Sequence, residues 1–584
     1  MLTTRLRACF ALTTLLVLGA CGGGSGTGTS ASNTAASAES STEQAPAVSN
    51  GAPLPLNVTN PSPPQASRFL AQASFGATTS SIDAVTASGI ANWVDGQFLK
   101  PQTLHHDYLR SIQATLPTGT SLGQNEFFES FWKQATTGDD QLRQRMTYAL
   151  SQIFVISMQD NGVGEHPMLA ASFYDMLGTN AFGNYRTLLE SVALHPAMGV
   201  YLTSLHNSKE SGERTPDENF AREVMQLMSI GLYELNADGT QKLVNGEPVE
   251  TYSSADIRGM AKVFTGWSWA GPDKSEPRFY GGNPDPEKES KPMQAYPQFH
   301  STSEKTFLGV TIPAQSTGDP AASLKIALDR LFNHPNVGPF IGKQLIQRMV
   351  TSNPSPAYVS RVAAAFANNG QGVRGDMKAI IKAILLDPEA RNDTNLTASD
   401  VGKIREPILR LGAWMRAFGA KSPSNRFLLK SMDDPLYSIG QSPMRSPSVF
   451  NFYRPGYVPP NTSIATANLV APEMQLVGET SIVGYVNTLR EIVPNGLGGT
   501  DHDVKPDYSV ELSLADTPEK LLDRVNLLLL ANQMTPALRA QILGAIGSVT
   551  VSATDANAAN AARKNRVSIA VYLTMVSTEF LVQK

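Results

Sequence analysis

Cysteine is almost absent from this chain of 584 residues, which contains only Cys9 and Cys21. Cys9 lies in an N-terminal segment typical of a secretory signal and would be removed with it. A mature chain with one cysteine can form neither an intramolecular disulfide nor a cysteine metal cluster. A body of this size buries enough apolar surface to be stable without disulfides.

Strong charge of one sign and long apolar runs are also missing. The formal net charge is −4, and it becomes −6 once residues 1–20, which hold Arg5 and Arg7 and no acidic residue, are removed. Such mild acidity argues against a nucleic-acid partner. No segment after residue 21 offers the roughly 18 consecutive apolar residues of a transmembrane helix.

Several motifs of common enzyme families are absent as well. The body has no P-loop, no dinucleotide-binding fingerprint on a strand–helix unit and no His-Glu-x-x-His. These absences count against a nucleotide enzyme and a Rossmann oxidoreductase. Residues 236–247 imitate a calcium loop but carry Gln241 where that loop needs glycine. We therefore expect neither a metal ion nor another cofactor.

The N-terminal sequence gives the clearest indication of where the protein is located. Arg5 and Arg7 precede a short apolar run over residues 8–18, and Leu18-Gly-Ala-Cys21 follows. This pattern resembles a bacterial lipobox, which predicts a signal peptide over 1–20 and acylation of Cys21. The alternative is an ordinary signal that happens to end beside a cysteine. Acylation would attach the exported protein to a lipid bilayer, and Gly22 resembles the outer-membrane sorting pattern if the source is Gram-negative.

The remaining chain divides into a tether and a body. Residues 21–65 are mainly Gly, Ser, Thr, Ala and Pro, which predicts a disordered tether. Residues 66–584 predict one large, mainly α body, with two lobes as an alternative and a boundary near 270–304 or 421–470. Asp238-Gly239 and Asn245-Gly246 favour hairpin turns, so we expect a small β-hairpin over 233–252.

The densest polar motif predicts a helix over 216–232. Thr215 and Glu218 have the spacing of a capping box, and Asp217 suits the first helical turn. Asn219, Arg222, Glu223 and Gln226 share one helical face. Either this stripe lines a cleft with Glu223 as a general base, or it is an ion-pair stripe that fixes helix packing. The candidate catalytic or polar-cleft residues are Asp217, Glu218, Asn219, Arg222 and Glu223.

A second candidate is the loop over residues 440–457, where aromatic side chains alternate with arginines. Aromatic faces with forked donors suit sugar rings, acidic groups or a peptide. The alternative is a proline-rich loop whose aromatic rings are buried against the core. The candidate ligand-binding residues are Arg445, Phe450, Asn451, Tyr453 and Arg454.

Six segments resemble, in the same order, the bacterial family called domain of unknown function 1800. They are Arg68-Phe-Leu-Ala-Gln-Ala-Ser-Phe-Gly-Ala77, His195-Pro-Ala-Met-Gly-Val-Tyr-Leu202, Pro216-Asp-Glu-Asn-Phe-Ala-Arg-Glu223, Val263-Phe-Thr-Gly-Trp267, Lys305-Thr-Phe-Leu-Gly309 and Ser446-Pro-Ser-Val-Phe450. The resemblance implies a large helical exported protein and no established reaction. It also implies a sulfatase-like partner protein, because genes of such a family often stand beside it. Met228 stands where many members have histidine, so a role for that histidine does not carry over.

Two functions follow as hypotheses. The first is an accessory lipoprotein that binds a partner protein or an envelope or extracellular polymer. The second is a hydrolase acting on such a polymer through carboxylates, with Glu223 and Asp217 or Glu218 near Arg222. Burial of Glu223 away from a cleft would count against the second.

Overall fold

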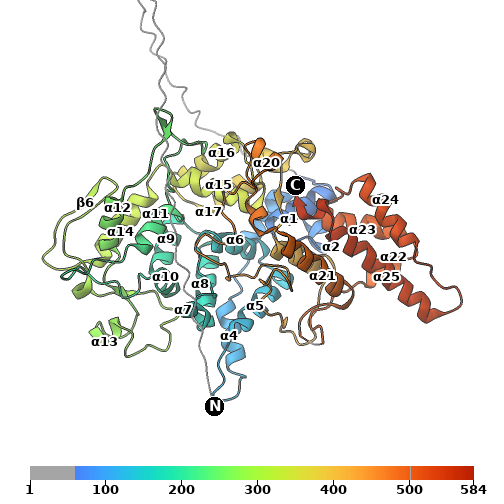
Figure 1. Ribbon diagram of the computed structural model, residues 1–584, viewed down its shortest axis with the longest axis horizontal. Helices are drawn as coiled ribbons and strands as arrows, with labels where there is room; N and C mark the ends of the chain where they lie inside the picture. The colour runs from blue at the N-terminus through green and yellow to red at the C-terminus, as the bar shows by residue number, and fades with distance from the viewer. Residues whose placement is uncertain (1–58, 500) are drawn as a thin grey trace, which may run out of the picture. The chain divides into compact units, whose positions relative to one another are not determined.

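The computed structural model describes residues 59–499 and 501–584 (Figure 1). The chain divides into two units, Met1–Ala52 and Pro53–Lys584, and every described residue belongs to the second. The predicted signal peptide, Cys21 and most of the predicted tether lie outside the described residues. The predicted body, residues 66–584, falls within the second unit.

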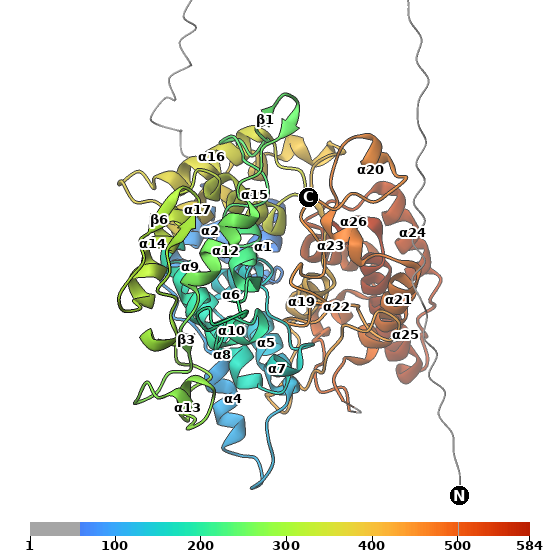
Figure 2. The ribbon, with the colours of Figure 1, turned by 60° about the vertical axis from the view of Figure 1, so that its left-hand side comes forward.

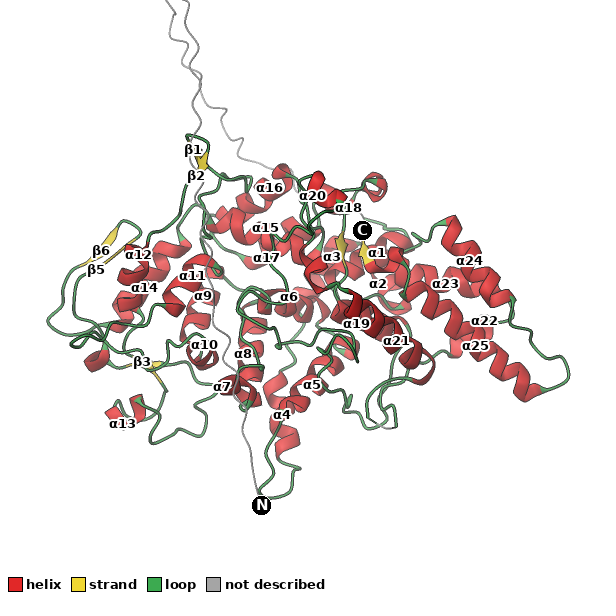
Figure 3. Ribbon diagram, in the orientation of Figure 1, coloured by secondary structure: helices red, strands yellow, loops and turns green. Residues whose placement is uncertain are grey.

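Helices dominate the described residues, which confirms the mainly α fold class (Figure 3). The helices before residue 300 are α1 (Pro63–Ala73), α2 (Thr79–Ser88), α3 (Ile90–Phe98), α4 (His105–Gln113), α5 (Gln124–Thr137), α6 (Gln141–Ser151), α7 (Asn161–Gly164), α8 (Pro167–Asn180), α9 (Tyr185–Leu194), α10 (Pro196–Tyr201), α11 (Asn219–Gln226), α12 (Ser254–Val263), α13 (Glu276–Phe279) and the 3₁₀ turn η1 (Pro297–Phe299).

The later helices are α14 (Pro320–Phe332), α15 (Val337–Met349), α16 (Pro356–Ala367), α17 (Met377–Leu385), α18 (Pro388–Arg391), α19 (Pro407–Ala417), α20 (Ser463–Thr466), α21 (Glu479–Asn495), α22 (Ser509–Leu514), α23 (Pro518–Leu530), α24 (Pro536–Gly547), α25 (Ala556–Met575) and α26 (Thr578–Leu581). Two 3₁₀ turns, η2 (Asp393–Thr397) and η3 (Pro472–Leu476), lie among them. Helix α25 packs against α21, α22, α23 and α24, the orange-to-red group in Figure 2.

Many of these helices begin at a cap and a proline that the sequence provides. Ser62 accepts the N–H of Gln65, whose side chain returns to Ser62, and Pro63 occupies the first helical position of α1. His195 likewise accepts the N–H of Ala197 at 3.2 Å ahead of Pro196 in α10. Such caps satisfy backbone donors that a helix start leaves unpaired.

The strands of the described residues form four antiparallel pairs. They are β1 (Leu243–Val244) with β2 (Glu247–Pro248), β3 (Trp267–Ser268) with β4 (Gln294–Ala295), β5 (Lys305–Phe307) with β6 (Val310–Ile312), and β7 (Lys403–Ile404) with β8 (Val582–Gln583). The first pair confirms the predicted hairpin, and its turn residues Asn245 and Gly246 both have positive φ. The last pair joins the C-terminus to the start of α19.

The predicted helix over 216–232 is wrong at both ends, because α11 spans only Asn219–Gln226. The predicted capping box does not form. Instead, the Asp217 side chain accepts the N–H of Asn219 at 2.8 Å. The Asn207 side-chain amide donates to the carbonyl of Asp217 at 3.2 Å and accepts its N–H at 3.0 Å. These bonds hold residues just before α11 outside the helix. After Gln226 the chain tightens into a turn that ends at Gly231, whose φ is +73°.

Candidate functional site

The five residues predicted from the polar motif do not converge. Asp217, Asn219 and Arg222 are exposed, and Arg222 forms a 3.4 Å ion pair with Glu218. Glu223 is buried at 7% exposure, and its Oε2 has no hydrogen-bond partner within the described residues. Burial raises the pKa of Glu223, against the opposing effect of Arg222. The shared helical face is therefore split between solvent and core.

The loop over residues 440–457 is fastened to the body. Arg445 forms a 2.9 Å ion pair with Asp433, and Asn451 and Tyr453 are buried. Arg454 is exposed and lies over the half-buried ring of Phe450, 4.7 Å from its centroid. Of the five predicted ligand-binding residues, Phe450 and Arg454 thus form the part of the loop that combines an aromatic ring with a solvent-facing arginine.

Beneath this loop lies a buried polar centre, which we define as Tyr148, Gln152, Lys403, Glu406, Gln441 and Glu473. Oε2 of Glu406 accepts hydrogen bonds from the Tyr148 hydroxyl at 2.7 Å and from the amides of Gln152 and Gln441 at 2.6 and 2.8 Å. Tyr453 joins the centre, because its hydroxyl lies 3.2 Å from the Gln152 amide. The loop therefore contacts the same groups that donate hydrogen bonds to Oε2 of Glu406.

Lys403 lies between the two carboxylates of the buried polar centre. Its Nζ is 2.9 Å from Oε1 of Glu473 and 3.8 Å from Oε1 of Glu406, and all three side chains are almost completely buried. Burial alone would raise both carboxyl pKa values, and it does raise that of Glu473. Lys403 and the hydrogen bonds outweigh burial at Glu406 and lower its pKa. The centre is an ion cluster inside the body, in which Oε1 of Glu406 and Oε2 of Glu473 have no hydrogen-bond partner within the described residues.

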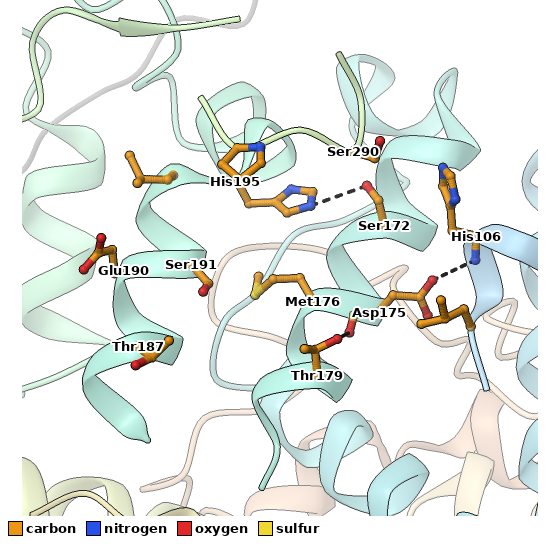
Figure 4. A pocket seen from close by; sticks show the side chains of 13 residues that line it. His106, Ser172, Asp175, Met176, Thr179, Thr187, Glu190, Ser191, His195 and Ser290 are labelled. Carbon is orange, nitrogen blue, oxygen red and sulfur yellow. Dashed lines mark hydrogen bonds between the residues drawn. The ribbon is translucent and has the colours of Figure 1, made fainter. Parts of the chain in front are cut away.

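An open cavity of about 490 Å³ lies between α4, α8 and α9, and we call it the α4–α8–α9 cleft (Figure 4). Helix α8 supplies one wall and packs against both α4 and α9. Ten of its 14 residues are buried. The lining includes two carboxylates, two imidazoles and five hydroxyls but no lysine or arginine: Asp175, Glu190, His106, His195, Ser172, Thr179, Thr187, Ser191 and Ser290.

Asp175 is the titrating group of this cleft. Its two oxygens accept the backbone N–H groups of His105 and His106, at 2.9 and 2.8 Å, where α4 begins without a side-chain cap of its own. Only 7% of the residue is exposed. Burial raises the pKa of Asp175 to about 7, although the two N–H bonds act in the opposite direction. The group is thus poised to exchange a proton near neutral pH.

Ser172 and His195 lie 3.4 Å apart in the same cleft but are not arranged as a nucleophile and its base (Figure 4). Nδ1 of His195 accepts the N–H of Ala197, so the ring proton is on Nε2, which faces Ser172. The Ser172 hydroxyl donates to the carbonyl of Glu289 at 2.6 Å. Burial lowers the pKa of His195 to about 3, so the ring stays neutral and serves to cap α10.

Glu190 of α9 also lines the cleft, and in Figure 4 its side chain points away from Asp175. It is exposed and forms a 2.6 Å ion pair with Arg186 one turn earlier on α9. Arg186 also binds Asp329 at 2.7 Å, so its charge is shared between two carboxylates. The lining of the cleft is therefore acidic once Asp175 is ionised. A positively charged group with hydroxyl neighbours is the complementary ligand.

Comparison with known proteins gives a family match over most of the chain. Residues 68–582 match the family model described as "Protein of unknown function (DUF1800)". The chain belongs to this family. No curated protein and no solved structure matches the chain. This member of DUF1800 has no cluster of three or more His, Cys, Asp or Glu fit to hold a metal ion among residues 59–499 and 501–584. In the same residues, no helix is both long and apolar enough to cross a membrane.

One feature of the sequence could have pointed to the cleft, although the motif search did not include it. Asp175 is the only charged residue in the 14 residues of α8, whose other positions are mostly apolar. A lone carboxylate in an apolar helix must be buried with partners or serve a site. Its partners, the N–H groups at the start of α4, lie about 70 residues earlier, so only the structure reveals them.

Proposed function

We propose that this DUF1800 protein is an accessory binding protein of the cell envelope. It would hold a hydroxyl-bearing, positively charged segment of an envelope or extracellular polymer in the α4–α8–α9 cleft. The observation that carries the proposal is Asp175, a nearly buried carboxylate with a pKa of about 7 at the wall of an open cavity. A cavity of this size lies within the range of ligand-binding sites.

The composition of the cleft supports this ligand class. Five hydroxyl side chains can exchange hydrogen bonds with sugar hydroxyls, and no cationic side chain in the lining competes for the carboxylates. A cationic amine near Asp175 would form a charge-assisted hydrogen bond in a partly desolvated place. Amino-sugar polymers combine both features, hydroxyls and free amines, at a regular spacing.

Calorimetric titration with a glucosamine tetramer at pH 7.5 tests this proposal. We expect the tetramer to bind and its fully N-acetylated form, which lacks the cation, to bind at least tenfold more weakly. Asp175→Asn should weaken binding of the amine form about tenfold, since one charge-assisted contact of about 1.4 kcal/mol is lost. Asp83→Asn, at an exposed aspartate of α2, is the matched control and should change nothing. Equal affinity for both tetramers would refute the proposal.

One observation favours a second candidate, hydrolysis of the same polymer. A carboxyl group with a pKa of about 7 can act as a general acid or base at neutral pH. In such a hydrolase the catalytic carboxylate would be Asp175. Glu223, the carboxylate first predicted for this role, is buried on the core side of α11. The same samples decide between the two: new reducing ends formed by the wild type and not by Asp175→Asn would establish the hydrolase.

We propose membrane attachment through an acylated Cys21, on the strength of the lipobox-like sequence Leu18-Gly-Ala-Cys21. The protein would then be exported and held at a membrane, the outer one if the source is Gram-negative. In cells fed a labelled fatty acid, the wild type should take up label and Cys21→Ser should not. A labelled Cys21→Ser protein would contradict lipid attachment at this residue.

A further inference from the structure

A second and larger cavity, of about 740 Å³, lies between α21, α22 and α25. We call it the α21–α25 groove. Its lining is cationic, whereas the α4–α8–α9 cleft is acidic: Arg490 of α21 and Lys564 of α25 both line the groove, and no aspartate or glutamate does. The two cavities therefore call for ligands of opposite charge.

The charged groups of the groove have no protein partners. Both Arg490 and Lys564 are exposed, and neither side chain makes an ion pair or hydrogen bond within the described residues. The nearest acidic neighbours along the chain are engaged elsewhere. Asp507 forms a 2.8 Å ion pair with Lys421, and Glu491 binds Asn495 and lies 3.8 Å from His502. The groove thus presents two cations without protein partners, one from α21 and one from α25.

Two tyrosine hydroxyls add hydrogen-bond donors to the groove. The Tyr508 hydroxyl accepts the indole N–H of Trp414 at 2.9 Å, so its own proton is free to be donated. Burial raises the pKa of Tyr508, so the hydroxyl keeps that proton. The hydroxyl of Tyr572 also has no partner within the described residues. A ligand that fits would bring acceptor oxygens with negative charge.

Apolar side chains also line the groove: Val493 and Pro494 of α21, Leu512 of α22, Val567 and Ile569 of α25, and Pro506. Asn495, Asn565 and Ser568 add uncharged polar groups to the lining. A groove that combines apolar side chains with two cations is complementary to a molecule with an acyl chain and an anionic head. The volume is within the range of cavities that enclose small organic ligands.

We propose that the α21–α25 groove binds a single-chain amphiphile with an anionic head, carboxylate or phosphate, whose charge meets Arg490 and Lys564. The acyl chain would lie against Val493, Leu512 and Ile569. This site is independent of the ligand proposed for the α4–α8–α9 cleft, and either can fail without the other.

The test is titration of the full-length protein with four soluble amphiphiles of equal chain length, below their micelle concentrations. Dodecanoate and dodecyl phosphate should bind, while dodecyl maltoside and dodecyltrimethylammonium should bind at least tenfold more weakly. The double variant Arg490→Gln/Lys564→Gln should lose at least tenfold in affinity for dodecanoate. The matched control is Arg258→Gln/Lys520→Gln, two exposed residues outside the groove with no side-chain partner among the described residues.

Three results would overturn the proposal. One is equal affinity for anionic and neutral amphiphiles, which would show an apolar surface without head-group recognition. Another is an unchanged affinity for dodecanoate in both the groove variant and the control variant. Binding only to vesicles of anionic phospholipid, with no binding of dodecanoate, would also contradict it, since a single chain is the proposed occupant. All variants face the groove or solvent, and unchanged circular dichroism confirms that they fold.

Discussion

Replacing Lys403 by methionine should lower the free energy of unfolding by about 3–5 kcal/mol, the range for removal of one partner from a buried ion pair. The methionine fills much of the same volume but leaves Glu406 and Glu473 buried without their shared cation. The lysine also donates to the carbonyl of Arg348 at 2.8 Å, and that acceptor would lose a partner. Urea unfolding followed by circular dichroism measures the effect.

The control for this experiment is Lys520→Met on α23, where the lysine is exposed and has no side-chain partner within the described residues. A surface change of this kind should stay within about 0.5 kcal/mol of the wild type. If Lys403→Met shifts stability no more than Lys520→Met does, the buried polar centre is not the ion cluster that the distances indicate.

Asp175→Asn should change how stability depends on pH. The folded protein holds the Asp175 proton more tightly than the unfolded chain, because burial raises the pKa from an ordinary 3.8 to about 7. A raised carboxyl pKa means that the wild type loses stability as pH rises through this interval. The asparagine does not titrate. The unfolding free energy of the wild type minus that of Asp175→Asn should therefore fall by about 2–4 kcal/mol between pH 4 and pH 8.

This difference isolates one group, because every other titrating residue is common to both proteins. Asp83→Asn, an exposed substitution on α2 outside the cleft, provides the comparison. If the curve of Asp175→Asn runs parallel to that of the wild type, Asp175 has an ordinary affinity for its proton and the account of the cleft is wrong.

Local features of the fold were predictable from the sequence because they depend on neighbouring residues. Pro196 begins α10 and Asn245-Gly246 turns the hairpin, as the backbone preferences of these residues require. The helix after Thr215 was mispredicted because a residue outside the window, Asn207, binds the backbone of Asp217. A pattern search over consecutive residues cannot include that competitor.

The sites depend on contacts between distant segments, and for that reason the sequence did not predict them. Lys403 and Glu473 meet across 70 positions, and Tyr148 reaches Glu406 across 258. The sequence motif pointed to Glu223 as the candidate carboxylate. The structure instead shows Asp175 in the lining of an open cavity, with its pKa raised by burial. Ligand binding by the loop over 440–457 stays a prediction, and two of its buried members, Gln441 and Tyr453, bind the buried polar centre.

The most direct test of the central claim, a cleft whose ligand affinity is controlled by Asp175, is the ratio of two affinities. The affinity of the glucosamine tetramer is measured for the wild type and for Asp175→Asn between pH 5.5 and pH 8, and the ratio cancels the ionisation of the ligand itself. With a pKa of about 7 at Asp175, the ratio should rise at least about tenfold over this interval, since only the carboxylate attracts the amine. A ratio that stays constant across the interval would contradict the account.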